Sequence, residues 1–69
     1  MEKLVLRNEY ITLGQLLKAV NLVEDGVEAK EAIRAGEASV NGEVDTRRGR
    51  KLYDGDKVNF RDTEILVVR

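Results

Sequence analysis

The sequence predicts an α+β fold in which two short helices pack on a small antiparallel β-sheet. Apolar residues recur with helical spacing over residues 13–20 and again over residues 29–36. Beyond residue 36 the apolar residues alternate with polar ones, which is the period of a strand. The dipeptide Asn41-Gly42 lies in this alternating region and favours a tight hairpin turn, because both residues tolerate positive φ. Apolar residues with helical spacing, followed by apolar residues that alternate with polar ones, therefore predict two helices and then a sheet.

Composition excludes several classes of function. The 69 residues are expected to form one domain, 1–69, and they include no Cys and no His. Disulfides, thiolate nucleophiles and Ser-His-Asp triads are therefore excluded, and the commonest metal ligand and neutral-pH base are both missing. No apolar run approaches the ~20 residues of a membrane span, and the first residues lack the apolar segment of a signal peptide. We expect a cytoplasmic protein that is not an enzyme, with no cofactor, no metal, no membrane partner and no small-molecule substrate.

The first half of the chain predicts an edge strand and a helix. Residues 3–7 are short and aliphatic, as in an edge strand. Thr12 can cap a helix, and Gln15 three residues later can complete a capping box. The apolar positions that follow predict a helix over residues 12–20, and its buried stripe consists of Leu13, Leu16, Leu17 and Val20.

A second helix is predicted over residues 27–35, after a connector that ends in Asp25 or Gly26 as the cap. Gly36 is expected to end this helix in the left-handed conformation. Lys30 and Arg34 are four residues apart, so they share one face beside the apolar stripe. The expected buried stripe consists of Ala29, Ala32, Ile33 and Gly36.

The remaining residues predict short strands joined by turns. A hairpin is expected over residues 38–44 around Asn41-Gly42. Further segments are expected in this order: a loop over 45–51, a brief pairing at 52–53, a turn at 54–56, a strand over 57–61, a turn at 62–63 and a strand over 64–68. The two carboxylates of Asp54-Gly55-Asp56 are best explained as turn residues, because the segment has too few ligands for a calcium loop.

Positive charge is concentrated in the loop over residues 45–51. The loop has a net charge of +3, although the whole chain has a net charge of −1. Arg side chains bind phosphate oxygens in a planar fork, so the loop predicts a phosphate-binding segment. Its cations are Arg47, Arg48, Arg50 and Lys51. The alternatives are a solvated loop, or a loop whose cations pair with acids, namely Glu24, Asp25, Glu28 or Glu43.

Three cations on the helices and two tyrosines can each be interpreted in two ways. Lys18, Lys30 and Arg34 can extend the positive surface of the loop, or they can be ordinary charges on a helix surface. Tyr10 and Tyr53 can stack on nucleobases, or they can cover the edge of a thin core.

Five segments of the chain match the pattern of a known family. The segments are LGQLLK (13–18), LV (22–23), GVEAKEAI (26–33), GEASVNG (36–42) and GDKV (55–58). With these segments the chain resembles the S-four RNA-binding domain, also called the alpha-L motif. The loop TRRGRKL (46–52) resembles that of the small stand-alone bacterial members. The resemblance implies a non-catalytic module that binds structured RNA, either ribosomal or transfer RNA, with the ribosome as a further partner.

The resemblance also implies where RNA binds. Carried over by position, the contact residues are Lys18, Lys30, Arg34, Arg47, Arg48, Arg50 and Lys51. Glu24, Asp25 and Glu28 depart from the family pattern, which is often rich in Ser, Gly or Arg before the second helix.

Two alternative functions belong to other classes. Segments around Asn41-Gly42 and Asp54-Gly55-Asp56 also look like those of ubiquitin-like sulfur carriers of the β-grasp type, although this chain lacks the terminal Gly-Gly that such chemistry needs. The third possibility is a protein–protein interaction domain, in which the exposed edge of residues 64–68 pairs with a strand of another protein.

Overall fold

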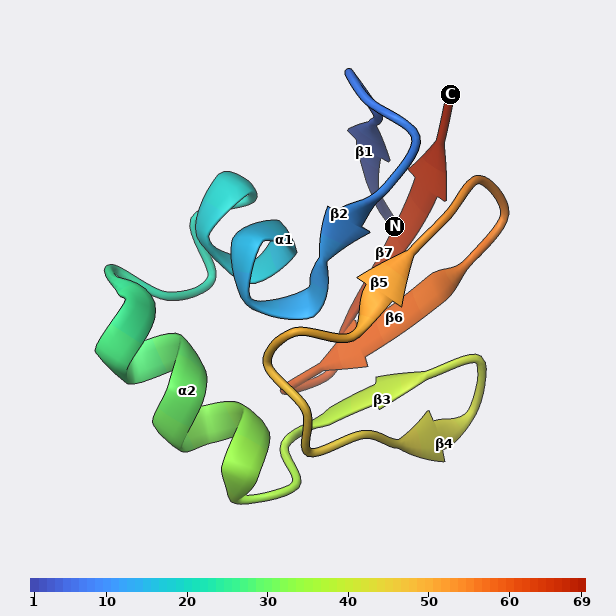
Figure 1. The fold of residues 1–69 in the computed structure, drawn as a ribbon. Coiled ribbons are helices and arrows are strands. Elements are labelled where there is room, and N and C mark those ends of the chain that lie inside the picture. The colour runs from blue at the N-terminus through green and yellow to red at the C-terminus, as the bar shows by residue number, and fades with distance from the viewer.

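A computed structural model describes all residues from 1 to 69. The chain forms two helices and seven strands, and the helices lie on one side of the main sheet (Figure 1). In chain order the elements are β1 (Glu2–Val5), β2 (Ile11–Thr12), α1 (Leu13–Ala19), α2 (Gly26–Arg34), β3 (Ala38–Val40), β4 (Glu43–Val44), β5 (Lys51–Leu52), β6 (Lys57–Phe60) and β7 (Thr63–Val68). The predicted class, two short helices packed on a small sheet, is confirmed.

The main sheet is mixed rather than wholly antiparallel. Its strand order is β1-β7-β6-β3-β4, while β2 and β5 form a separate antiparallel pair. β1 runs parallel to β7, with Leu4 beside Val67, and every other pair in the main sheet is antiparallel. Parallel neighbours need a crossover connection, and here most of the chain lies between the two strands.

β7 is an inner strand of this sheet, so one expectation was wrong. Its residues pair with β1 on one side and with β6 on the other, as in the register of Ile65 with Glu2 and with Val58. The edge of residues 64–68 is therefore already occupied and does not offer a strand to another protein. The sheet edges belong to β1 and to the two-residue strand β4.

α1 begins with the predicted capping box. The Thr12 hydroxyl accepts a hydrogen bond from the Gln15 amide at 3.3 Å, and the Gln15 side-chain oxygen accepts one from the Thr12 amide at 3.1 Å. These bonds satisfy backbone donors that the first turn of a helix leaves free. The helix spans Leu13–Ala19 and is one residue shorter than predicted at each end.

α2 begins after Asp25, which is one of the two caps proposed from the sequence. An Asp25 carboxylate oxygen accepts a hydrogen bond from the Glu28 amide at 2.8 Å. Glu28 in turn accepts a hydrogen bond from the Glu24 amide at 2.8 Å, so both acids help to fix the start of the helix. Gly36 has φ +83° and follows the last turn in the left-handed conformation, as expected.

Two tight turns set the register of the C-terminal strands. Asn41 and Gly42 have φ values of +52° and +89°, which confirms the predicted hairpin turn. The turn between β6 and β7 consists of Arg61 and Asp62, one residue earlier than predicted, because Phe60 already pairs with Thr63. Two residues with positive φ then close the hairpin without disturbing the strand twist.

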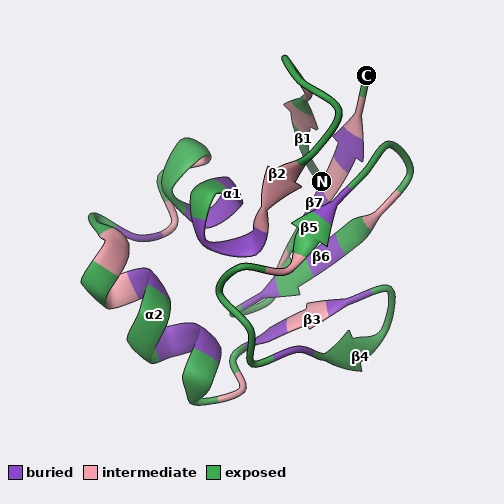
Figure 2. Ribbon diagram, viewed as in Figure 1, coloured by how far each residue is buried: buried purple, intermediate pink, exposed green.

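The core lies between the helix pair and the inner face of the sheet, as the burial colours in Figure 2 show. β6 alternates in the expected way, with Val58 and Phe60 buried and Lys57 and Asn59 exposed on the outer face. The predicted helix stripes are buried, apart from half-buried Val20 and Gly36. Other buried core residues are Val23, Ala38, Val40, Leu52, Ile65 and Val67. Neither helix is long and apolar enough to cross a membrane.

Candidate nucleic-acid interface

The cationic loop after β4 is bound to the first turn of α1 by its backbone. The Leu13 amide donates to the Arg50 carbonyl at 2.8 Å, and the Gly14 amide donates to the Arg48 carbonyl at 3.0 Å. These are helix N-terminal donors that would otherwise need water or a cap. The pairing of β2 with β5 continues the attachment. The loop is therefore held in a defined position on the helix.

Gly14 allows the Arg48 side chain to lie directly on α1. A Cβ atom at position 14 would be 2.6 Å from Arg48 Cγ and 3.5 Å from the Arg48 carbonyl oxygen. Side chains larger than hydrogen would therefore displace Arg48. The close approach fixes the base of the Arg48 side chain, and Arg48 forms no ion pair with any carboxylate.

Asp45 organises two of the other loop cations. Its carboxylate is 7% exposed and accepts hydrogen bonds from Arg47 Nε at 3.0 Å, Arg47 Nη2 at 2.7 Å and Arg50 Nη1 at 2.7 Å. The hydrogen bonds from Arg47, joined by that from Arg50, hold the pKa of Asp45 well below its usual range. The loop cations do pair with an acid, but with the loop's own Asp45 and with none of the four acids considered from the sequence.

Lys51 and the two tyrosines meet at the far end of this loop. The Lys51 ammonium nitrogen lies 4.9 Å from the centre of the Tyr10 ring, within the range of a cation–π contact. The Tyr10 and Tyr53 ring centres are 6.0 Å apart, and both side chains are partly exposed, Tyr10 by 38% and Tyr53 by 49%. The structure thus brings together two aromatic residues that are far apart in the sequence.

A depression of about 340 Å³ lies between α1, α2 and the cationic loop. We call it the α1–α2 depression; it is lined by Thr12, Gly14, Gln15, Lys18, Gly26, Ala29, Arg48 and Gly49. Its two cations, Lys18 and Arg48, come from different elements, and neither forms an ion pair. Two of the predicted site residues therefore line one concave surface that contains no carboxylate.

Lys30 and Arg34 come after the depression along α2. Gly26 lines the depression, and Lys30 and Arg34 follow it by one and two turns, which keeps them on the same side of the helix. Both side chains are exposed, and neither pairs with a carboxylate. Lys30 and Arg34 do not line the depression, and Glu31 lies between them in the helix sequence.

Glu28 of α2 faces Arg61 rather than a cation of the loop. Glu28 lies 3.8 Å from the Arg61 guanidinium, and Arg61 forms a closer pair with Glu37 at 2.7 Å. The hydrogen bond from Arg61 lowers the pKa of Glu37. Arg61 was not singled out in the sequence, and no local pattern indicates its role, since Glu37 is far from it along the chain. Glu28 is therefore paired with Arg61, whereas Glu31, the other acid of α2, forms no ion pair.

Comparison with known proteins places the chain in a family. A family model described as the S4 domain matches residues 4–68, and the chain belongs to this family. The resemblance to the S-four domain is thus confirmed, and it leaves the ubiquitin-like alternative without support.

Two relatives and one solved structure are similar to the chain. "Probable ribosome maturation protein RlbA" of Bacillus subtilis (strain 168) is 52% identical over 52 residues, which are 75% of this chain and 73% of that protein. "Putative RNA-binding protein YbcJ" of Escherichia coli (strain K12) is 36% identical over 62 residues, which are 90% of this chain and 89% of that protein. The solution structure of YbcJ, described as revealing an alpha-L motif involved in RNA binding, superimposes with a TM-score of 0.76 at 34% identity. The superposition covers 100% of this chain and 89% of the YbcJ chain.

Proposed function

We propose that this protein binds structured RNA, either ribosomal or transfer RNA, in connection with the ribosome, and that it acts by binding alone rather than as an enzyme. One observation carries the proposal: Lys18 and Arg48, from a helix and a loop, line one depression with no carboxylate in it. Support also comes from the S4 family and from relatives whose names refer to RNA binding and to ribosome maturation.

The mechanism is phosphate recognition by preorganised cations. Arg48 is held against Gly14 by packing and by its backbone hydrogen bond, so less side-chain entropy is lost when it contacts a phosphate. Lys18, Lys30, Arg34 and Lys51 supply further cations that no carboxylate neutralises. Contacts of this kind fix the position of a protein on RNA by shape and backbone rather than by base sequence.

Arg47 and Arg50 have a mixed role in this proposal. Their ion pairs with Asp45 reduce the charge they offer to RNA, yet Arg47 is 68% exposed and Arg50 is 32% exposed. The Asp45 carboxylate holds both guanidinium groups on the loop and leaves their remaining N–H groups free to donate. Both residues therefore bind phosphate more weakly than Arg48, and they also shape the loop.

The test is a titration with ribosomal RNA and transfer RNA at several salt concentrations. Neutralising ~4 phosphates predicts a slope of about −3 to −4 in a plot of log affinity against log salt. Replacement of Arg48 by Ala is expected to lower affinity about tenfold, because a charge-assisted hydrogen bond is lost.

Lys57→Ala provides the matched control. It removes the same charge from the outer face of the sheet, where Lys57 is exposed and unpaired, so affinity should change less than about twofold. A flat salt response, or equal losses in the Arg48 and Lys57 variants, would contradict the proposal. Recovery of a stoichiometric protein partner without nucleic acid would favour the protein-interaction alternative instead.

A further inference from the structure

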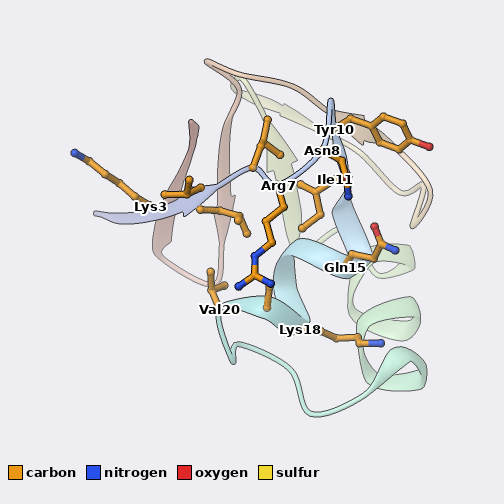
Figure 3. A pocket seen from close by; sticks show the side chains of 12 residues that line it. Lys3, Arg7, Asn8, Tyr10, Ile11, Gln15, Lys18 and Val20 are labelled. Carbon is orange, nitrogen blue, oxygen red and sulfur yellow. The ribbon is translucent and has the colours of Figure 1, made fainter. Parts of the chain in front are cut away.

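A second, larger concavity lies on the other side of α1. We call it the N-terminal groove: it has a volume of about 640 Å³ and lies between residues 3–8 and α1 (Figure 3). Its half-buried apolar residues include Leu4, Leu6, Ile11 and Val20, which also pack against the core. Ligand sites in proteins commonly have volumes of about 300–1,000 Å³, so this groove is large enough for one nucleotide.

Arg7 is the cation that enters the groove. Figure 3 shows its side chain crossing from the N-terminal segment toward Val20, whereas Lys3 points away. Arg7 is exposed and forms neither an ion pair nor a side-chain hydrogen bond with the protein. None of the twelve lining residues is acidic. The groove therefore attracts anions and offers a planar guanidinium that no protein group uses.

The N-terminal groove adjoins the α1–α2 depression. Gln15 and Lys18 line both concavities, so one exposed ridge of α1 separates them. An RNA backbone in contact with Arg48 and Lys18 would reach the groove by passing over this ridge. The groove thus extends the surface proposed to bind RNA.

We infer that the N-terminal groove accepts an unpaired nucleotide of the bound RNA. The apolar residues can pack against the flat face of a base. A phosphate alone would make no use of these apolar side chains. Arg7 is placed to contact the phosphate or to stack on the base, and the side-chain amides of Asn8 and Gln15 can bond to base edges. The Gln15 oxygen already accepts from the Thr12 amide, so its NH₂ group is the part left to donate. This inference rests on the proposed RNA-binding function.

The test compares a blunt RNA duplex with the same duplex carrying a short unpaired tail of adenosines. The wild-type protein is expected to bind the tailed RNA about fivefold more tightly. The tail should also shift the NMR amide signals of Leu6, Ile11 and Val20. Arg7→Ala is expected to remove most of this preference while changing affinity for the blunt duplex less than about twofold. Lys57→Ala should retain the full preference.

The possible failures are distinguishable. Equal binding of both RNAs by the wild-type protein, or equal losses for both RNAs in Arg7→Ala, would overturn the inference and leave the proposed function intact. Failure to bind these RNAs, ribosomal RNA and transfer RNA alike would overturn the proposed function and this inference together.

Discussion

At the scale of single residues, Asp45 has the most constrained environment in the chain. It is the one buried acidic residue, and it bridges two guanidinium groups and the Arg47 amide. A carboxylate in this position costs desolvation energy, and the hydrogen bonds it accepts offset that cost. Asp45 thus serves as the anchor around which the cationic loop is arranged.

The Asp45→Asn substitution should lower stability in a pH-dependent manner. At pH 7 we expect a loss of about 1–2 kcal/mol, because Asn carries no charge to pair with the two guanidinium groups and offers only one acceptor oxygen. The folded-state pKa of Asp45 lies below its unfolded value of about 4, so this stabilisation is complete above that pH and decreases as the pH falls further. The wild-type and variant free energies of unfolding should therefore converge below about pH 4.

Denaturant titrations between neutral and acidic pH measure this difference. Glu43→Gln serves as the control, because it removes the same charge from an exposed side chain with no ion pair. Its effect on stability should be small at every pH. A constant difference between wild type and Asp45→Asn down to the lowest pH would contradict this account.

Gly14→Ala tests the contact between α1 and Arg48. Alanine stabilises a helix by up to about 1 kcal/mol relative to glycine, but overpacking costs about 1–3 kcal/mol. The Cβ atom would be 2.6 Å from Arg48 Cγ, so we expect a net loss of about 1 kcal/mol and a displaced Arg48. RNA affinity should fall, as measured by the same titrations used for Arg48→Ala.

Gly49→Ala is the matched control for Gly14→Ala. It lies in the same depression, but no atom would lie within 4 Å of its Cβ. Its stability and its RNA affinity should remain close to those of the wild type. Equal effects of the two substitutions would show that the Gly14–Arg48 contact is unimportant.

At the scale of elements, α2 carries cations and acids on its exposed surface. Lys30 and Arg34 follow Gly26 of the α1–α2 depression at four-residue spacing, Glu31 lies between them, and Glu28 faces Arg61. Asp25 lies at the helix start, next to Gly26 in the depression, and its carboxylate caps the helix. Asp25 is therefore an acid directly next to a residue of the proposed RNA surface.

The Asp25→Asn substitution should remove the negative charge of Asp25 while keeping its role as the helix cap. Asn and Asp cap helices about equally well, so stability should change by less than about 0.5 kcal/mol. Removal of the negative charge should raise RNA affinity about twofold at low salt, with a smaller gain as salt screens the charge. Asp25→Ala, by contrast, should also lower stability by about 1 kcal/mol. An unchanged affinity in Asp25→Asn would show that this carboxylate does not face the bound RNA.

At the scale of the whole molecule, stability depends on a small core and on a sheet in which the two ends of the chain pair with each other. β1 pairs with β7, and Phe60 lies fully buried on β6 beneath the helices. A domain of this size has a total stability of only about 3–10 kcal/mol at ~0.05–0.15 kcal/mol per residue. One large core side chain therefore accounts for much of the total.

Phe60→Ala is expected to cost about 3–5 kcal/mol and to unfold a large fraction of the protein at 37 °C. Thermal unfolding followed by circular dichroism measures the effect. Tyr53→Ala is the control, because this aromatic side chain is 49% exposed and should cost less than about 1 kcal/mol. A Phe60→Ala protein as stable as Tyr53→Ala would contradict the assignment of the core.

The sequence by itself determined the local structure of this protein. The capping box at Thr12, the left-handed Gly36 and the Asn41-Gly42 turn were predicted and are present. Asp25 is the cap of α2 and was one of the two residues proposed for it. These features depend on residues within a few positions of one another. Residue spacing alone is therefore enough to recognise them, and together with the apolar periods they predicted the fold class.

Only the tertiary structure decided how distant segments meet. Three contacts join residues far apart in the chain. β1 pairs in parallel with β7, the Arg48 side chain packs on Gly14, and Arg61 pairs with Glu37. Thirteen acids were available to twelve cations, and spacing does not say which pairs form. Packing of the helices on the sheet settles that choice, because it fixes which charged side chains come within a few ångströms of one another.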